Sequence, residues 1–420
     1  MSPVSMNRRR LIAASLAVPA LAPGALARMR TNEKITLGLI GMGIRGRNML
    51  RRYWLANEGF QVVAVCDVDT SRREDAKRRV DEAYGNSDCT AHVDYGEVLA
   101  RDEVDAVVIA TPDHWHALQI LDACKAGKDI YCEKPLTLTL GEAKAAMDAA
   151  RTSGCVFQTG SQQRTEFGQR FIRAVELIRA GRIGDVLTVN VGVGNPPRAC
   201  DLGEEALEEG LDWDRWLGPA PLRPYNSVLS PRGVHGHYPR WRDYWEYAGG
   251  GLADMGAHHF DIAQWGLGMD ASGPVRVEPP TDPSSRRGAE VVYANGTRLT
   301  HGGPSGATFI GTEGMIHVDR GRLSSIPGGI LEGELDSGEE LPRPRDHAED
   351  WRQAILTRGR PSCDAEIGAR SVAVCQLMGL AYRHGRALDW DPDAWQFVGP
   401  DAPQEWLDVA HREGYSLEGR

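Results

Sequence analysis

The sequence lacks several features that would place it in a specialised class. No apolar run is long enough to span the ~30 Å hydrocarbon core of a bilayer. There is no basic block outside the extreme N-terminus, and the formal net charge is −10. This charge argues against nucleic acid or anionic lipid as a partner. No internal repeat or low-complexity tract occurs. The composition is that of a soluble globular protein and is compatible with a neutral small-molecule substrate.

The eight cysteines also lack the spacing of a redox or metal motif, because none forms a Cys-x-x-Cys pair. Several lie in apolar stretches, where a free thiol behaves as a small buried hydrophobe. We therefore expect neither a disulfide framework nor a zinc site.

The N-terminus has the pattern of a targeting segment. Arg8–Arg10 precede an apolar stretch over residues 11–22, and Ala25–Ala27 supply a small-residue cleavage pattern. This order resembles a twin-arginine signal, whose machinery exports folded proteins, often with cofactor inside. We expect a signal peptide over residues 1–27, cleavage after Ala27, and a periplasmic or otherwise exported protein. The alternative is a basic N-terminus without a targeting role.

A length of 420 residues predicts about two domains. Residues 34–160 alternate apolar strand patterns with helical patterns, which implies right-handed crossovers and a parallel, doubly wound α/β sheet. The expected strands are 35–40, 61–66, 104–110, 130–132 and 156–159. The expected helices are 47–55, 71–84 with a capping box at Ser71, 114–126, and one capped at Thr139. In residues 161–420 we expect strands over 275–277, 290–293, 298–301 and 307–310, and helices over 348–356 and 366–382.

A glycine motif directly follows the first expected strand. Gly41 permits a tight turn, Gly43 lets the backbone approach a pyrophosphate, and Gly46 lets helix and strand pack closely. Ile44 and Arg45 complete this turn, whose N–H groups would face the phosphates. Asp67 ends the next strand, where a carboxylate accepts hydrogen bonds from an adenosine ribose. The motif predicts a bound NAD or NADP.

The choice between the two dinucleotides depends on neighbouring charges. Asp67 would repel a 2′-phosphate and favours NAD. Arg72 and Arg73 stand just beyond and would pair with such a phosphate if they faced it. We favour NAD.

Two further turns follow expected strands at the edge where open α/β sheets bind ligands. One contains Thr111, His114 and His116; the other is Glu133-Lys134-Pro135. Lys134 is a candidate proton shuttle or hydrogen-bond donor, although a lysine in a turn is often only a solvated charge.

Together, the glycine motif, the Thr-Pro-x-x-x-His turn and the Glu-Lys-Pro turn resemble the Gfo/Idh/MocA family of oxidoreductases. The resemblance covers nearly the whole chain after the signal, including the Trp-Asp-Arg-Trp-Leu-Gly-Pro segment at 213–219. It implies a Rossmann domain over 34–160 and a C-terminal α/β domain over 161–420 with a large open, mostly antiparallel sheet. It also implies that Lys134 is catalytic, that His114 and Glu133 lie beside the nicotinamide ribose, and that the protein forms a homo-oligomer.

In the second domain, Asp254, His258 and Asp261 have the spacing of one helix face. A carboxylate beside an imidazole fixes its tautomer, which suits acid–base catalysis, and the resemblance matches Asp254 and His258 to the family's catalytic pair. The alternative is a helix cap with a core histidine. His235 and His237 would add ligands for a divalent ion, but their loop shows no rigid spacing, and we expect no metal.

Substrate contacts are expected from loops near these groups, since aromatic faces and arginine forks suit polyhydroxylated ligands. The candidates are Gln162, Arg164, His237, Trp245 and His258.

These features predict oxidation of a sugar or polyol hydroxyl, with the proton removed by Lys134 or His258 while Asp254 orients His258. An exported enzyme has no ready pool of free dinucleotide, so we expect it to hold and regenerate its cofactor in each turnover. An NAD-dependent glycoside hydrolase working by transient oxidation and elimination satisfies the same condition. A non-catalytic dinucleotide or sugar sensor is a third possibility.

Overall fold

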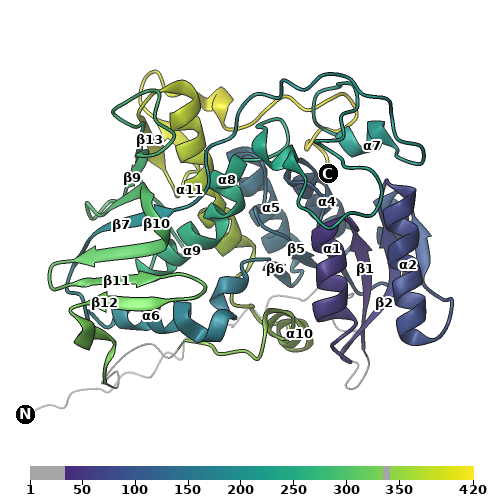
Figure 1. Ribbon diagram of the computed structural model, residues 1–420, viewed down its shortest axis with the longest axis horizontal. Coiled ribbons are helices and arrows are strands. Elements are labelled where there is room, and N and C mark those ends of the chain that lie inside the picture. The colour runs from purple at the N-terminus through teal and green to yellow at the C-terminus, as the bar shows by residue number, and fades with distance from the viewer. Residues whose placement is uncertain (1–33, 334–340) are drawn as a thin grey trace, which may run out of the picture. The chain divides into compact units, whose positions relative to one another are not determined.

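The computed structural model describes residues 34–333 and 341–420 (Figure 1). The expected signal peptide, residues 1–27, lies outside the described residues. Within the described part of the chain, no helix has both the length and the apolar character needed to cross a membrane.

The first part of the chain forms a six-stranded parallel sheet with strand order β3-β2-β1-β4-β5-β6, as the strand–helix alternation predicted. Its strands are β1 (Ile35–Ile40), β2 (Phe60–Cys66), β3 (Thr90–His92), β4 (Ala106–Ile109), β5 (Asp129–Cys132) and β6 (Phe157–Thr159). Its helices are α1 (Ile44–Met49), which continues as a π-helix over Leu50–Trp54, α2 (Thr70–Tyr84), α3 (Tyr95–Leu99), α4 (Asp113–Lys125) and α5 (Leu140–Ser153).

The N-termini of α5 and α2 test the two capping boxes predicted from the sequence. Thr139 caps α5 in a reciprocal capping box with Glu142, as predicted. The capping box expected at Ser71 is wrong. The Asp69 side chain caps α2 by accepting hydrogen bonds from the backbone N–H groups of Ser71 and Arg72, because an aspartate two residues earlier offers a better-placed acceptor.

The second sheet has eight strands, which pair with their neighbours in antiparallel orientation. It follows the path β12-β11-β10-β9-β8-β13-β14, with β7 also paired to β10. The strands are β7 (Val186–Gly192), β8 (Arg276–Glu278), β9 (Glu290–Val292), β10 (Arg298–Gly311), β11 (Met315–Val318), β12 (Leu323–Ile326), β13 (Leu388–Asp391) and β14 (Gln396–Val398). The open antiparallel sheet expected of the C-terminal domain is therefore present.

The strand β10 corrects one expectation. The ranges 298–301 and 307–310 were predicted as two strands separated by turn residues, but they belong to one strand. The glycines and Pro304 between them produce register shifts against β7 rather than a turn.

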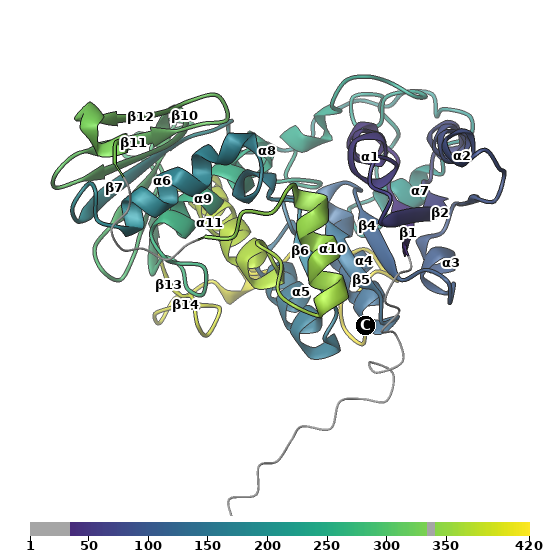
Figure 2. The same ribbon diagram turned by 90° about the horizontal axis from the view of Figure 1, so that it is seen from below.

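Helices pack on one face of the second sheet and join it to the first. They are α6 (Arg170–Arg179), α9 (Gly256–Gly266) and α11 (Ala365–His384) (Figures 1 and 2). Apolar side chains of both sheets share one buried cluster through these helices. The helix α10 (His347–Thr357) instead returns to the first sheet, where Trp351 packs among Trp54, Phe60 and Tyr131. The two remaining short helices are α7 (Trp213–Leu217) and α8 (Gly250–Asp254).

Candidate active site

The turn after β1 has the geometry that the glycine motif requires. Gly41 has a positive φ of 89°, a region that L side chains rarely occupy. A Cβ on Gly46 would lie 2.1 Å from the Gly41 carbonyl oxygen, so helix and strand touch there. A Cβ on Gly43 would meet no atom within 4 Å. Gly43 therefore faces open space of the kind a phosphate would fill.

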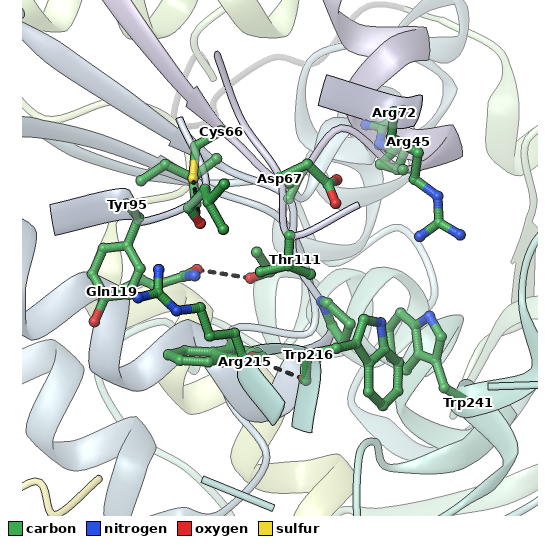
Figure 3. Close-up of a pocket in the computed structure, with 18 of the residues that line it drawn as sticks. Arg45, Cys66, Asp67, Arg72, Tyr95, Thr111, Gln119, Arg215, Trp216 and Trp241 are labelled. Atoms are coloured by element: carbon green, nitrogen blue, oxygen red, sulfur yellow. Dashed lines mark hydrogen bonds between the residues drawn. The ribbon is translucent and has the colours of Figure 1, made fainter. Parts of the chain in front are cut away.

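That open space is part of a cavity of about 450 Å³, within the size range of small-molecule and cofactor sites. Its walls come from the ends of β1, β2 and β4, from the long connection after β7 (residues 215–242) and from Tyr415. In Figure 3, Asp67 and Arg45 lie on one side of the cavity, and Trp216 and Trp241 lie opposite them. The predicted cofactor residues that line it are Gly41, Gly43, Ile44, Arg45, Asp67 and Thr111.

The Asp67 carboxylate is fixed by its surroundings. It accepts hydrogen bonds from the backbone N–H of Met42 at 2.7 Å and of Asp69 at 2.9 Å. Burial raises the pKa of Asp67, while Arg72 and these N–H groups oppose the rise. An acceptor pre-oriented at the end of β2, beside the glycine turn, fits an adenosine ribose. The cavity therefore fits a dinucleotide held between the glycine turn and Asp67.

The two arginines after Asp67 already donate hydrogen bonds to other groups of the protein. The Arg72 guanidinium donates to the Ser230 hydroxyl and to the carbonyl oxygens of Pro231 and Gly233. Arg73 donates to the Asp67 carbonyl and the Thr70 hydroxyl. Both side chains thus hold local structure together around the cavity.

The histidines of the Thr111 turn do not line the cavity. His114 is buried, with Nε2 3.1 Å from the Trp216 carbonyl oxygen. His116 has its ring nitrogens 2.9 and 3.0 Å from the carbonyl oxygens of Pro135 and Thr111. Burial lowers the pKa of both imidazoles. These positions fit neutral histidines that hold the turns, rather than groups beside a ribose.

Lys134 meets Asp254 across the two domains. Lys134 Nζ donates to Asp254 Oδ1 at 2.8 Å and to the Asp254 carbonyl oxygen at 2.7 Å. Arg242 Nε lies 3.5 Å from the same carboxylate oxygen. Burial alone would raise the pKa of Asp254, but Lys134 and Arg242 outweigh it, and the pKa is lowered. The result is a charged triad whose side chains remain partly open to solvent.

His258 does not form the predicted pair with Asp254. The helix predicted to carry both residues breaks at Met255, between α8 and α9, and the Asp254 carboxylate bonds Lys134 instead. Nδ1 of His258 is buried and has no hydrogen-bond partner within the described chain. Burial lowers the pKa of His258 well below its usual value, and Lys134 and Arg320 lower it further. His258 is thus a neutral imidazole next to two cations.

Glu133, beside Lys134, is buried in a small polar network. Arg45 from the glycine turn donates to Glu133 Oε1 at 2.7 Å, and Gln162 Nε2 donates to the same oxygen at 3.0 Å. Burial alone would raise the pKa of Glu133, but Arg45 outweighs it, and the pKa lies below its usual value. Gln162, predicted to contact substrate, instead positions this carboxylate.

Three other predicted substrate residues lie elsewhere. Arg164 is buried and pairs with Asp261 and Asp270, so its guanidinium faces carboxylates rather than the cavity. His237 is exposed, and its ring centroid lies 4.5 Å from that of His235, with the two rings tilted by 40°. Trp245 lines a separate cavity, where Arg383 lies over its ring.

The donors considered for a divalent ion are therefore not gathered at one point. Asp261 is taken by Arg164, and Asp254 by Lys134. His235 lies on the wall of the dinucleotide cavity.

Sequence reasoning missed two groups of this site. Arg320, in the turn between β11 and β12, donates from Nε to Gln163 Oε1 at 3.0 Å, and no local motif marks it. Asp113, the first residue of α4, is buried, and burial raises its pKa to about 8 despite the opposing effect of Arg242. Its position inside the Thr-Pro turn was the available signal.

Comparisons with known proteins agree with this arrangement. Residues 35–161 match a family model described as an oxidoreductase family, NAD-binding Rossmann fold. Residues 198–417 match the C-terminal alpha/beta domain of the same family. The chain is 30% identical over 210 residues to an inositol 2-dehydrogenase of Acidothermus cellulolyticus, covering 49% of this chain and 59% of that relative. It is 26% identical over 371 residues to a 1,5-anhydro-D-fructose reductase of Ensifer adhaerens, covering 83% and 97%.

The fold is also shared with solved structures. The WlbA dehydrogenase of Bordetella pertussis, solved in complex with NADH and UDP-GlcNAcA, aligns with a TM-score of 0.59 at 19% identity and covers 86% of this chain and 99% of that one. The matched family models cover both domains that build the cavity and the Lys134–Asp254 contact. The chain therefore belongs to the Gfo/Idh/MocA oxidoreductase family.

Proposed function

We propose that the protein is an NAD-dependent oxidoreductase that acts on a hydroxyl group of a sugar or polyol. The observation that carries the proposal is the contact between Lys134 and Asp254, at 2.8 Å, which joins the dinucleotide-binding domain to the domain that holds His258. The names of the two curated relatives, one acting on inositol and one on an anhydro-sugar, support this substrate class.

NAD is favoured over NADP by the groups around the adenosine end. A 2′-phosphate would lie close to the Asp67 carboxylate, which repels it. Arg72 and Arg73, the cations that would compensate, already donate to protein oxygens. When bound, the nicotinamide supplies hydride transfer. Gly43, Arg45 and Asp67 would hold the cofactor in the cavity.

Proton transfer falls to the residues at the domain boundary. A neutral His258 accepts the hydroxyl proton, since the lowered pKa keeps its imidazole unprotonated at neutral pH. Lys134, held beside the Asp254 carboxylate, donates a hydrogen bond to the substrate oxygen. Asp254 positions the Lys134 ammonium, and Arg242 helps to keep that carboxylate ionised. His258 and Lys134 thus act on the reacting oxygen, and Asp254 and Arg242 support Lys134.

Replacing Lys134 with methionine tests the proposal. Removing one hydrogen-bond donor to an oxygen that gains negative charge costs about 10²–10³-fold in kcat, so we expect kcat for the best sugar in a panel to fall by at least about 100-fold. The matched control is Lys144→Met, because Lys144 forms a solvent-exposed pair with Asp148 within α5. Unchanged turnover in Lys134→Met would overturn the catalytic assignment.

We further propose that the protein is exported by a twin-arginine signal and retains its dinucleotide. Segments distant in sequence wall the cavity on more than one side, which supports retention. Arg72 and Arg47 donate to the loop around residues 230–235, and Tyr415 lines the wall. Mass spectrometry of cofactor released from protein purified from the periplasm tests both points. Less than one dinucleotide per ten chains would contradict retention, and precursor confined to the cytoplasm would contradict export.

The same sugar panel separates the alternative activities. Substrates are scored for oxidised and reduced products and for cleavage of aryl and methyl glycosides. Cleavage without net redox would favour the glycoside-hydrolase mechanism. Saturable sugar binding without any product, in the wild type and in Lys134→Met alike, would favour a sensor.

A further inference from the structure

The substrate side of the active site carries more positive than negative charge, although the chain as a whole carries a net −10. Its cations are Arg45, Lys134, Arg242 and Arg320, and its charged carboxylates are Glu133 and Asp254. Arg45 pairs with Glu133 at 2.7 Å, while Lys134 and Arg242 share Asp254.

Nearby acids do not restore the balance. Glu166 is engaged by Arg52 and by the Tyr53 hydroxyl, each at 2.7 Å. Asp113 is largely protonated at neutral pH, since burial raises its pKa to about 8. Of the two unbalanced positive charges, one belongs to Lys134 and Arg242, which share the Asp254 carboxylate. The other belongs to Arg320.

Arg320 forms no ion pair with any residue in the described ranges 34–333 and 341–420. Its Nε donates to the neutral amide of Gln163, and its guanidinium lies over the Phe167 ring at 4.8 Å. Asp319, its neighbour in the turn, accepts from the backbone N–H groups of Gly321 and Arg322 instead.

A short chain of contacts places Arg320 beside the proton acceptor. Gln163 Oε1 accepts from Arg320, and Gln163 Nε2 donates to the His258 carbonyl oxygen at 3.2 Å. The charged and titratable groups that act on Arg320 from the surrounding elements are Arg45, Asp254, Glu166 and Tyr238. Burial lowers the pKa of Arg320, and Arg45 lowers it further. A partly desolvated guanidinium near another cation is in an unfavourable setting that an anion would relieve.

We propose that the substrate is an acidic sugar, whose carboxylate binds Arg320 while the hydroxyl to be oxidised faces Lys134 and His258. This inference rests on the proposed function and names its substrate class. The planar guanidinium fork of arginine matches a carboxylate with two parallel hydrogen bonds. Gln163 engages Nε, and neither terminal nitrogen of Arg320 forms a hydrogen bond within residues 34–333 and 341–420, so both remain available as donors to a ligand.

Matched pairs of sugars test the proposal with the NAD-loaded protein. D-Galacturonate is compared with D-galactose, and D-glucuronate with D-glucose, since each pair differs only at C6. We expect kcat/KM for the better uronate to exceed that of its neutral partner by at least about tenfold. We also expect its KM to rise when the salt concentration is raised, because ions screen the contact. Equal values for both members of each pair, or a stronger preference for D-glucose 6-phosphate, would overturn the proposal.

The variant Arg320→Gln keeps a polar side chain but removes the charge. We expect it to raise the KM for the uronate about 10- to 100-fold and to change the KM for the neutral partner much less. Arg322→Gln is the matched control, since Arg322 is exposed in the same turn; it should change neither substrate more than twofold. Equal losses for acidic and neutral sugars in Arg320→Gln would contradict a carboxylate contact.

Calorimetric titration of D-galacturonate and D-glucuronate into the NAD-loaded protein separates this inference from the proposed function. Binding of a uronate that is lost in Arg320→Gln, without turnover of any sugar, would support the substrate class and contradict the reaction. Turnover of neutral sugars that is unchanged in Arg320→Gln would support the reaction and contradict the acidic substrate class.

Discussion

Replacing Arg164 with methionine should destabilise the protein strongly without acting on the substrate. Arg164 and Asp261 have side chains 2% and 0% exposed. The guanidinium donates through Nε and a terminal nitrogen to Asp261 and also reaches Asp270. Removing one partner of a buried pair leaves an uncompensated charge, at a cost of about 3–5 kcal/mol. Among the side chains that the structure describes, the Ser371 hydroxyl alone would remain as a donor to the Asp261 carboxylate.

The assay is urea denaturation followed by circular dichroism, with the midpoint shift measured at constant slope. Arg164→Met and Asp261→Asn should each lower the free energy of unfolding, and the double variant should lose clearly less than their sum. Arg240→Met is the control, because Arg240 pairs with Asp243 at the surface, with side chains 68% and 37% exposed. Such pairs contribute about 0–1 kcal/mol.

Burial raises the pKa of Asp261 against the effect of Arg164. Without Arg164 the carboxyl would take up a proton, so the loss in Arg164→Met should be smaller at pH 5 than at pH 8. An unchanged midpoint together with a raised KM would refute this reasoning and return Arg164 to the substrate pocket.

Three other substitutions are predicted to have measurable effects. Gly46→Ala should cost about 1–3 kcal/mol of stability, because its Cβ would lie 2.1 Å from a backbone oxygen. Gly43→Ala should leave the urea midpoint unchanged but weaken NAD binding at least about tenfold, since its methyl would enter open cavity space; equal NAD affinity in the two proteins would contradict the phosphate position. Asp113 has a folded pKa of about 8, above the ~3.9 of an unfolded aspartate. The folded state therefore binds more protons between about pH 4 and 8, and this group makes stability fall as pH rises through that window. Asp113→Asn should remove this dependence, which urea midpoints at pH 5, 7 and 9 will show.

The dinucleotide half of the site was predictable because the residues that mark it lie close together in the sequence. Strand β1, the turn at Gly41–Gly46 and Asp67 lie within one β-α-β unit, and periodicity with glycine spacing is sufficient to place them. The Lys134 turn followed from the same rule about strand ends. Parallel strand order then brought these pieces to one edge of the sheet without further information.

The other half of the site depends on contacts between residues far apart in the sequence, which the spacing of residues in a motif does not predict. Helical periodicity placed Asp254 and His258 on one face, but a break at Met255 turned the carboxylate toward Lys134. Arg164 has the residue type of a ligand contact, yet its partner lies 97 positions away inside the core. Arg320 stands in a tight turn between two strands, and only the folding of the sheet brings it to Gln163.

The residues that form the two walls of the cavity are synthesised at different times. The glycine turn and Asp67 leave the ribosome early, whereas the opposite wall comes from residues 215–242 and finally from Tyr415, which are synthesised much later. The second wall of the nucleotide cavity is therefore complete only after the chain has been translated as far as Tyr415.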